Sequence, residues 1–155
     1  MPWSDRPTLG TDVIDPQNVE LAFQAILDEF SVIDVLVNNA GAGIRKPFQH
    51  MTPAEWDSLI AVNVKGMFHC TRTALQHMQP RQRGCIINIA SRAGRQAEPN
   101  LAVYSATKAA VIAFSRTLAH EVRISGIRVV TICPGPVDTE RIRHLRPSAD
   151  RASSS

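Results

Sequence analysis

The segment Val32–Ala40, with the sequence VIDVLVNNA, decides the fold class. It is short, rich in β-branched residues and closed by residues typical of turns, which predicts a buried strand of a parallel sheet. Two further segments share this pattern, GCIINIAS at Gly84–Ser91 and GIRVVTICPG at Gly126–Gly135. We therefore expect three buried parallel strands.

Longer segments of helical character separate these strands. Asp15-Pro16 predicts an N-cap and first residue for a helix that extends to about Phe30. Thr52-Pro53-Ala54-Glu55 adds a capping-box glutamate and predicts a helix over residues 53–79. A third helix is expected at residues 102–125, where small residues allow close packing. Strands that alternate with helices predict an α/β fold with right-handed crossovers.

Length and composition indicate one soluble globular domain. The chain has 155 residues, of which 44% are hydrophobic and 20% charged. It contains neither an apolar run of the roughly 18 residues that a membrane span needs nor the layout of a secretory signal. We therefore expect a cytoplasmic protein with no membrane partner.

The distribution of charge argues against a nucleic-acid partner. The net charge is +3, but residues 1–140 hold 13 of the 17 basic and 13 of the 14 acidic side chains. The excess lies in residues 141–155, a basic stretch without aromatic residues. The three cysteines, Cys70, Cys85 and Cys133, lack the spacing of a zinc site. We expect buried free thiols and no metal.

Polar residues follow each predicted strand, and ligands of open α/β sheets bind at that edge. Asn38–Gly41 follows the first strand, Ser91 ends the second and Pro134–Thr139 ends the third. Asn63 lies inside a predicted helix, where asparagine is unfavourable, with Gly66 soon after it. This pattern predicts a site or a kink.

Tyr104 and Lys108 are four residues apart near the start of the third predicted helix. Residues with this spacing share a helix face at about 5–6 Å between Cβ atoms. An ammonium group so close favours the phenolate form of a tyrosine, which would suit it to acid/base catalysis. The same pair also occurs on helix surfaces without any chemical role, so this motif alone leaves both interpretations open.

Taken together, five motifs resemble the classical short-chain dehydrogenase/reductase family, in particular its 3-oxoacyl-reductase-like members. In the family's order they are NNAG (Asn38–Gly41), VNVKG around Asn63, INIAS ending at Ser91, YSATK (Tyr104–Lys108) and PGPVDT (Pro134–Thr139). The resemblance extends from about Thr11 to Thr139. It implies a partial Rossmann-type parallel sheet and an NAD(P)-dependent oxidoreductase that interconverts a small-molecule carbonyl and an alcohol.

The resemblance also implies roles for individual residues. Tyr104 would exchange the proton with the substrate oxygen, Lys108 would assist it and bind the cofactor ribose, Ser91 would orient the substrate oxygen, and Asn63 would hold a relay water. The implied cofactor-binding residues are Asp12, Val13, Asn39, Ala40, Gly41, Tyr104, Lys108, Pro134, Gly135, Val137 and Thr139.

The chain departs from the family at both ends. The glycine-rich T-G-x-x-x-G-x-G loop, the first two strands and the last strand have no counterpart here. In the family strand order 3-2-1-4-5-6-7, a strand at Thr8–Val13 would lose its neighbours and VLVN would become an apolar edge. Unless those segments are supplied, we expect weak dinucleotide binding. Neither the choice between NAD and NADP nor the substrate is indicated.

We expect residues 1–140 to form a partial dinucleotide-binding domain and residues 141–155 to form a disordered basic tail. Three hypotheses follow: an incomplete chain of a reductase, an inactive binding or oligomerisation module, or a remodelled active oxidoreductase. In the family, the helices matching residues 53–79 and 102–125 form the subunit interface. A homo-oligomer through these helices is therefore expected.

Overall fold

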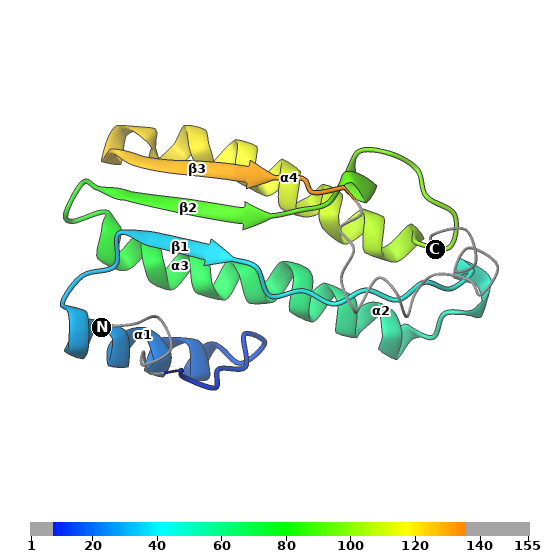
Figure 1. The fold of residues 1–155 in the computed structure, drawn as a ribbon, viewed down its shortest axis with the longest axis horizontal. Coiled ribbons are helices and arrows are strands. Elements are labelled where there is room, and N and C mark those ends of the chain that lie inside the picture. Colours follow the sequence, from blue (N-terminus) through cyan, green and yellow to red (C-terminus); the bar gives the residue numbers. More distant parts are fainter. Residues whose placement is uncertain (1–7, 136–155) are drawn as a thin grey trace, which may run out of the picture.

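The computed structural model describes residues 8–135, which form a three-stranded parallel sheet and four α-helices (Figure 1). The strands and helices are α1 (Pro16–Phe30), β1 (Val35–Asn38), α2 (Pro53–Ile60), α3 (Met67–Met78), β2 (Gly84–Ile89), α4 (Ala102–Val122) and β3 (Ile127–Ile132). Short helical turns are η2 (Phe48–His50), η3 (Ala61–Gly66), η4 (Arg92–Gly94) and η5 (Arg123–Ser125). The predicted α/β class and the three parallel strands are confirmed. The prediction that all three strands are buried is wrong, because β1 and β3 each expose alternate side chains on the face that no described helix covers.

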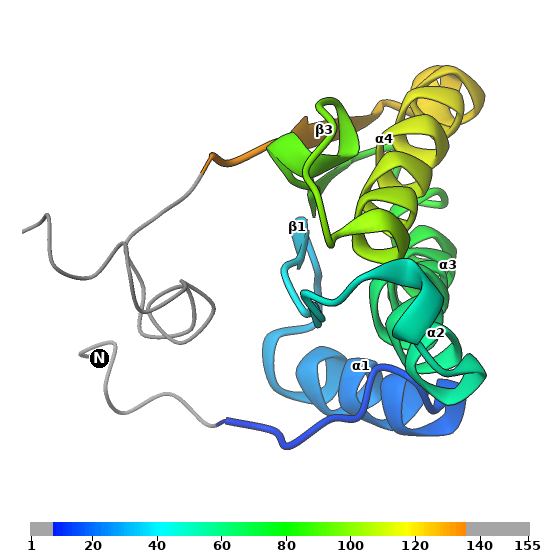
Figure 2. The ribbon, with the colours of Figure 1, turned by 90° about the vertical axis from the view of Figure 1, so that its right-hand side faces the viewer.

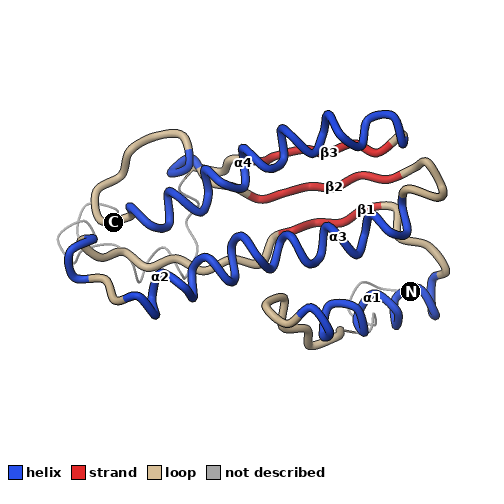
Figure 3. Tube along the Cα trace, turned by 180° about the vertical axis from the view of Figure 1, so that it is seen from behind, coloured by secondary structure: helices blue, strands red, loops and turns tan. Residues whose placement is uncertain are grey.

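The sheet has the order β1-β2-β3, with β2 in the centre. Asn38 of β1 pairs with Asn88 of β2, which pairs with Thr131 of β3. Because all three strands are parallel, their carboxyl ends meet at one edge of the sheet. Helices α3 and α4 cover one face of it (Figures 2 and 3).

Local capping explains where two helices begin. The Asp15 carboxylate accepts a hydrogen bond from the Gln17 N–H at 2.8 Å, and Thr52 forms a capping box with Glu55. Both helices also start with proline, whose backbone angle suits this position. The predicted helix over residues 53–79 is present but contains the π-helical turn η3 between α2 and α3.

The main core lies between the helices and one face of the sheet. Its buried members are Val19, Phe23, Ile33, Ala74, Met78, Ile86, Leu118, Val122 and Ile127. They come from α1, α3, α4, β2, β3 and the loop before β1, and α1 packs against α3 beyond the β1 edge (Figure 1). A second cluster of Met67, Ala90 and Val111 lies nearer the carboxyl ends of the strands.

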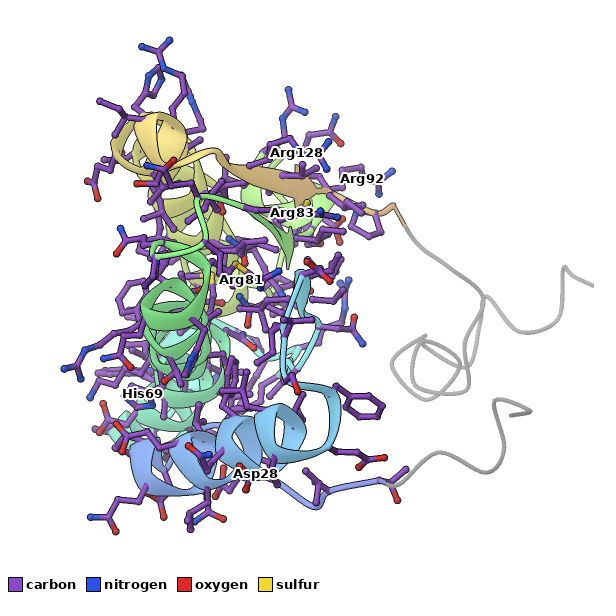
Figure 4. All side chains as sticks on the ribbon, turned by 90° about the vertical axis from the view of Figure 1, so that its left-hand side faces the viewer. Asp28, His69, Arg81, Arg83, Arg92 and Arg128 are labelled. Atoms are coloured by element: carbon purple, nitrogen blue, oxygen red, sulfur yellow. The ribbon has the colours of Figure 1, made fainter. Side chains whose placement is uncertain are left out.

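The opposite face of the sheet has no helix over it among the described residues (Figure 2). Val35, Val37, Val130 and Ile132 on this face are 53%, 52%, 44% and 45% exposed. Arg128 of β3 also lies on the side away from the helices (Figure 4). The predicted exposure of VLVN as an apolar edge is confirmed.

The expected strand at Thr8–Val13 is wrong. These residues have no neighbouring strand to pair with in the described part of the chain, and the chain turns instead. The Asp12 carboxylate accepts from the Ile14 N–H at 3.0 Å, and the Asp12 carbonyl accepts from the Asp15 N–H at 3.2 Å.

No helix within residues 8–135 has the length and apolar character that crossing a membrane requires. The tail expected at residues 141–155 lies outside the described residues.

Candidate functional site

The turn after β2 lies directly against the start of α4. Ser91 lies two residues after the strand and caps η4, in which Gly94 approaches the α4 backbone. A Cβ atom on Gly94 would lie 2.7 Å from the carbonyl carbon of Lys108, so a side chain does not fit there. This close approach brings the second strand end to the helix that carries Tyr104 and Lys108.

Asn63 joins the loop after β1 to α4. Its side chain is 3% exposed and lies in the π-helical turn η3. The amide donates to the Ala42 carbonyl at 2.9 Å and to Thr107 Oγ1 at 3.0 Å, and its oxygen accepts from the Ala42 N–H at 2.8 Å. The unfavourable asparagine and the irregular turn therefore occur together at an interaction between distant segments, as is common for π-turns at functional sites.

Lys108 is buried at the same place, with 6% exposure. Its Nζ donates to the Ile89 carbonyl at 2.8 Å and lies 5.8 Å from the centre of the Tyr104 ring. A Cβ on Gly41 would lie 3.5 Å from Lys108 Nζ and 3.3 Å from Asn63 Oδ1. The backbone of the NNAG loop thus approaches the side chains of both Asn63 and Lys108.

Tyr104 lies one helical turn before Lys108 and is half-buried. Thr107 Oγ1 donates to the Tyr104 carbonyl at 2.7 Å and accepts from Asn63 Nδ2. This pair of hydrogen bonds connects the turn that carries Tyr104 to Asn63. Three of the four expected catalytic residues, Asn63, Tyr104 and Lys108, are therefore linked by direct contacts or through one hydroxyl.

Ser91 is half-buried at the end of β2. Its Oγ accepts from the Ala93 N–H at 3.2 Å and so caps η4. Among the described residues no hydrogen bond joins it to Tyr104. The structure brings Ser91 to the same sheet edge, on the turn that Gly94 packs against α4.

A small cavity of about 20 Å³ separates the loop after β1 from α4. Its lining includes Asn38, Asn63, Cys70, Ile89 and Lys108. This volume holds about one water molecule, and the polar atoms around it could bind one. Burial raises the pKa of the Cys70 thiol, so this group stays protonated at neutral pH.

Ion pairs join the two loops beside the site. Glu98 lies between Arg45, at 3.2 Å, and Arg92, at 3.3 Å. The Lys46 N–H also donates to the Asn100 carbonyl at 2.8 Å. Arg92 lies at the sheet, away from the helices (Figure 4). The loop after β1 and the loop after η4 are thus held together.

The two expected adenine-binding residues, Asp12 and Val13, have different surroundings. Asp12 is exposed, whereas Val13 lines the small cavity and packs on Gly66, where a Cβ would lie 2.7 Å from Val13 Cγ2. The Val13 carbonyl also lies 3.2 Å from Nδ1 of His69, which belongs to α3 (Figure 4). The structure brings Val13 to the site but leaves Asp12 facing solvent.

The remaining expected cofactor-binding residues lie at the ends of β1 and β3. Asn39 and Ala40 are exposed, and Gly41 is half-buried beside Lys108. The Pro134 carbonyl accepts from the Arg92 N–H at 2.9 Å, and Gly135 is exposed. Val137 and Thr139 lie outside the described residues. Within residues 8–135, His, Cys, Asp and Glu form no group of three that could hold a metal ion.

Several buried polar residues near the site were missing from the sequence predictions. They are Thr71, Asn88, Thr107 and Ser115. A signal existed for Asn88, because an asparagine within the apolar run CIINIA must find hydrogen-bond partners when it is buried. The identity of those partners depends on the fold and could not be read from the sequence.

Known proteins resemble this chain over most of its length. A family model described as short chain dehydrogenase matches residues 6–150. The 3-oxoacyl-[acyl-carrier-protein] reductase FabG of Vibrio cholerae is 34% identical over 137 residues, which cover 88% of this chain and 56% of the relative. The 2-(R)-hydroxypropyl-CoM dehydrogenase of Xanthobacter autotrophicus is 41% identical over 135 residues, which cover 83% of this chain and 52% of the relative.

Solved structures give a similar result. ElxO with NADP bound superposes with a TM-score of 0.84 at 32% identity, covering 93% of this chain and 57% of that structure. NAD+-bound xylitol dehydrogenase superposes with a TM-score of 0.84 at 31% identity, and the match covers 93% of this chain and 56% of that structure. The chain spans about half the length of the curated relatives it matches.

Proposed function

Because the chain belongs to the short-chain dehydrogenase family of oxidoreductases, we propose that it carries the proton-transfer part of a nicotinamide-dependent site, with Tyr104 as the general acid/base. In the reducing direction, the Tyr104 hydroxyl gives its proton to the oxygen of a small-molecule carbonyl, whose carbon would receive the hydride that the cofactor supplies when bound. In the oxidising direction the phenolate takes the proton from the alcohol.

Three other residues support Tyr104 in this proposal. The Lys108 ammonium stabilises negative charge on the phenol oxygen and donates to ribose hydroxyls of the cofactor. Ser91 orients the substrate oxygen from the end of β2. Asn63 holds a water in the small cavity, from which a proton reaches Lys108.

A nicotinamide cofactor, NAD or NADP, would supply the hydride when bound. The residues present fit its ribose and nicotinamide side, since Gly41 leaves room beside the buried Lys108 ammonium and Asn39 and Ala40 are exposed after β1. Pro134, Gly135, Val137 and Thr139 would hold the carboxamide and a phosphate, and Asp12 and Val13 would lie near the adenine.

One observation carries the proposal: Asn63 and Lys108, from different helices, face one water-sized cavity, with the Tyr104 ring 5.8 Å from Lys108 Nζ. A helix-surface pair of tyrosine and lysine would place the ammonium in solvent, whereas Lys108 is buried. The geometry therefore supports the catalytic interpretation of YSATK over the surface one.

The test is carbonyl-dependent oxidation of NADH and NADPH, with 3-oxoacyl thioesters and simple ketones as substrates. Tyr104→Phe removes one hydroxyl and should lower the rate by about 100-fold or more. Ser105→Ala is the matched control, because it removes the neighbouring hydroxyl, which is buried without a hydrogen-bond partner in the described structure. A Tyr104→Phe chain as active as Ser105→Ala would contradict the proposal.

The outer face of the helices favours self-association as a second property. A groove of about 470 Å³ lies over α3 and α4, with Phe68, Leu75, Phe114 and Leu118 in its lining. Phe68 packs on Phe114 with the rings tilted by 45° and 4.7 Å between their centres, and Phe68 is still 40% exposed. A second copy of the chain would bury these rings.

This association is tested by light scattering after size-exclusion chromatography. Phe68→Glu should shift the chain toward the monomer, whereas Leu21→Glu on α1, at a residue 71% exposed, should not. A self-associating chain with no carbonyl reduction would favour the interaction module over the enzyme. A wild-type monomer would contradict the proposed interface.

A further inference from the structure

Four polar side chains form a buried set of hydrogen bonds beside the site. Asn38 Nδ2 donates to Thr71 Oγ1 at 3.0 Å and to Asn88 Oδ1 at 2.7 Å. Asn88 Nδ2 donates to Ser115 Oγ at 2.8 Å, and Ser115 Oγ donates to the Val111 carbonyl at 2.6 Å. Thr71, Asn88 and Ser115 are at most 2% exposed. The set joins β1, β2, α3 and α4.

Asn88 connects this set of hydrogen bonds to Lys108 through its neighbour in β2. Asn88 directly precedes Ile89, whose carbonyl accepts the hydrogen bond from Lys108 Nζ. Ser115 follows Lys108 by seven residues, which is two helical turns and about 10 Å along the same face of α4. Neighbouring residues of β2 are thus bonded to α4 at two points, and together these bonds fix how far α4 is shifted along the strand.

The polar character of residue 88 requires an explanation. Its neighbours on the helix-facing side of β2 are apolar or glycine, and a buried amide costs free energy unless its hydrogen bonds are made. Here both ends of the amide are bonded, one to β1 and one to α4. An apolar side chain would fill the space but would not specify the position of α4.

We propose that Asn88 is a positioning residue that keeps α4 where Lys108 Nζ reaches the Ile89 carbonyl and stays buried beside the cavity. Its effect on catalysis rests on the proposed function, but its effect on Lys108 does not. Removing the Asn88 amide should therefore increase the accessibility of Lys108 alone. If Asn88 only stabilised the fold, its removal would increase the accessibility of all three lysines alike.

The chain offers an internal reference for this test, because it contains three lysines, Lys46, Lys65 and Lys108. Competitive acetylation followed by mass spectrometry reports the reactivity of each amine in one sample. Asn88→Leu keeps the volume of the side chain and removes both hydrogen bonds. The acetylation rate of Lys108, relative to Lys46 and Lys65, should rise about tenfold in this variant.

Ile86→Val is the matched control. Ile86 is 0% exposed on the same strand and faces the same side, but its truncation removes one methylene and no hydrogen bond. The Lys108 ratio should stay at the wild-type value in this variant. If Asn88→Leu does not fold, Ser115→Ala removes the α4 end of the connection and should raise the ratio several-fold.

Two results would overturn the proposal: an unchanged Lys108 ratio in a folded Asn88→Leu or Ser115→Ala chain, or an equal rise at all three lysines. In an active preparation, Asn88→Leu should also lower kcat with little change in KM for the carbonyl substrate. If the wild-type chain reduces no carbonyl substrate, the proposed function is contradicted. The acetylation result would still test whether Asn88 positions Lys108.

Discussion

The two faces of the three-stranded sheet have similar residues in different surroundings. On the face under α3 and α4, Ile86 and Asn88 of β2 are 0% exposed. On the other face Val37 and Val130, which flank Ile87, are 52% and 44% exposed. Asn63 and Lys108 line one small cavity where the helices meet the strand ends.

This difference shows that burial here depends on which elements cover a face rather than on residue type. Strands with Val and Ile on both faces are typical of sheets covered on both sides. The described residues provide helices for one of them. The covered face should therefore supply most of the stability, and the open face should be available to other surfaces.

The largest expected effect compares one isoleucine on each face. Ile86→Ala should lower the free energy of unfolding by about 3 kcal/mol, because it leaves a cavity in the core. Ile132→Ala, at a residue 45% exposed on the open face, should lower it by about 0.5 kcal/mol or less. Urea unfolding followed by circular dichroism measures both. Equal losses would show that the open face is covered in solution.

A smaller loss of stability is expected when alanine replaces Gly94, one of two glycines that follow the strand ends. Gly94→Ala should lower the free energy of unfolding by about 2 kcal/mol, because its Cβ would lie 2.7 Å from the Lys108 carbonyl carbon. Gly135→Ala is the control, since within residues 8–135 no atom beyond its own chain neighbours lies within 4 Å of its Cβ position. The same urea titration compares them. A harmless Gly94→Ala would mean that η4 is not packed on α4.

Sequence reasoning predicted those parts of the fold that have local causes. The caps at Asp15 and Thr52 and the three apolar strands follow from neighbouring residues, and the structure has all of them. The expected strand at Thr8–Val13 failed because a strand needs a partner. The π-helical turn at Asn63 appeared in the sequence only as an unfavourable residue, since its hydrogen bonds go to Ala42 and Thr107.

The same distinction applies to the site. Tyr104 and Lys108 could be predicted as a pair because they share one helix, and the strand ends could be placed at one edge because the strands are parallel. The acceptor of Lys108, the Ile89 carbonyl, belongs to another element. The bond between Asn88 and Ser115 spans 27 residues of sequence. Contacts of this kind follow from packing, which a single sequence does not specify.

A charge placed on the open face should reduce self-association of the chain and leave its free energy of unfolding nearly unchanged. Val130→Lys places an ammonium group among the exposed aliphatic side chains and should reduce binding of a hydrophobic dye and light scattering. Leu21→Lys on α1 is the control for added charge, because Leu21 is exposed away from the sheet. If both variants reduce scattering equally, the open face adds no association surface to the proposed one over α3 and α4.

The smallest expected effect concerns the helix caps, which stabilise the covered side. Hydrogen bonds from Asn18 and the Gln17 N–H lower the pKa of Asp15, and those from the Thr52 N–H and Lys46 lower the pKa of Glu55. Since the unfolded chain binds these protons more readily, the free energy of unfolding should be constant above about pH 5 and fall below about pH 4. Asp15→Asn and Glu55→Gln keep capping at neutral pH but carry no titrating carboxylate, so each should reduce this slope in urea titrations across pH. An unchanged slope in the double variant would show that other carboxylates control acid unfolding and that the caps of α1 and α2 do not contribute to it.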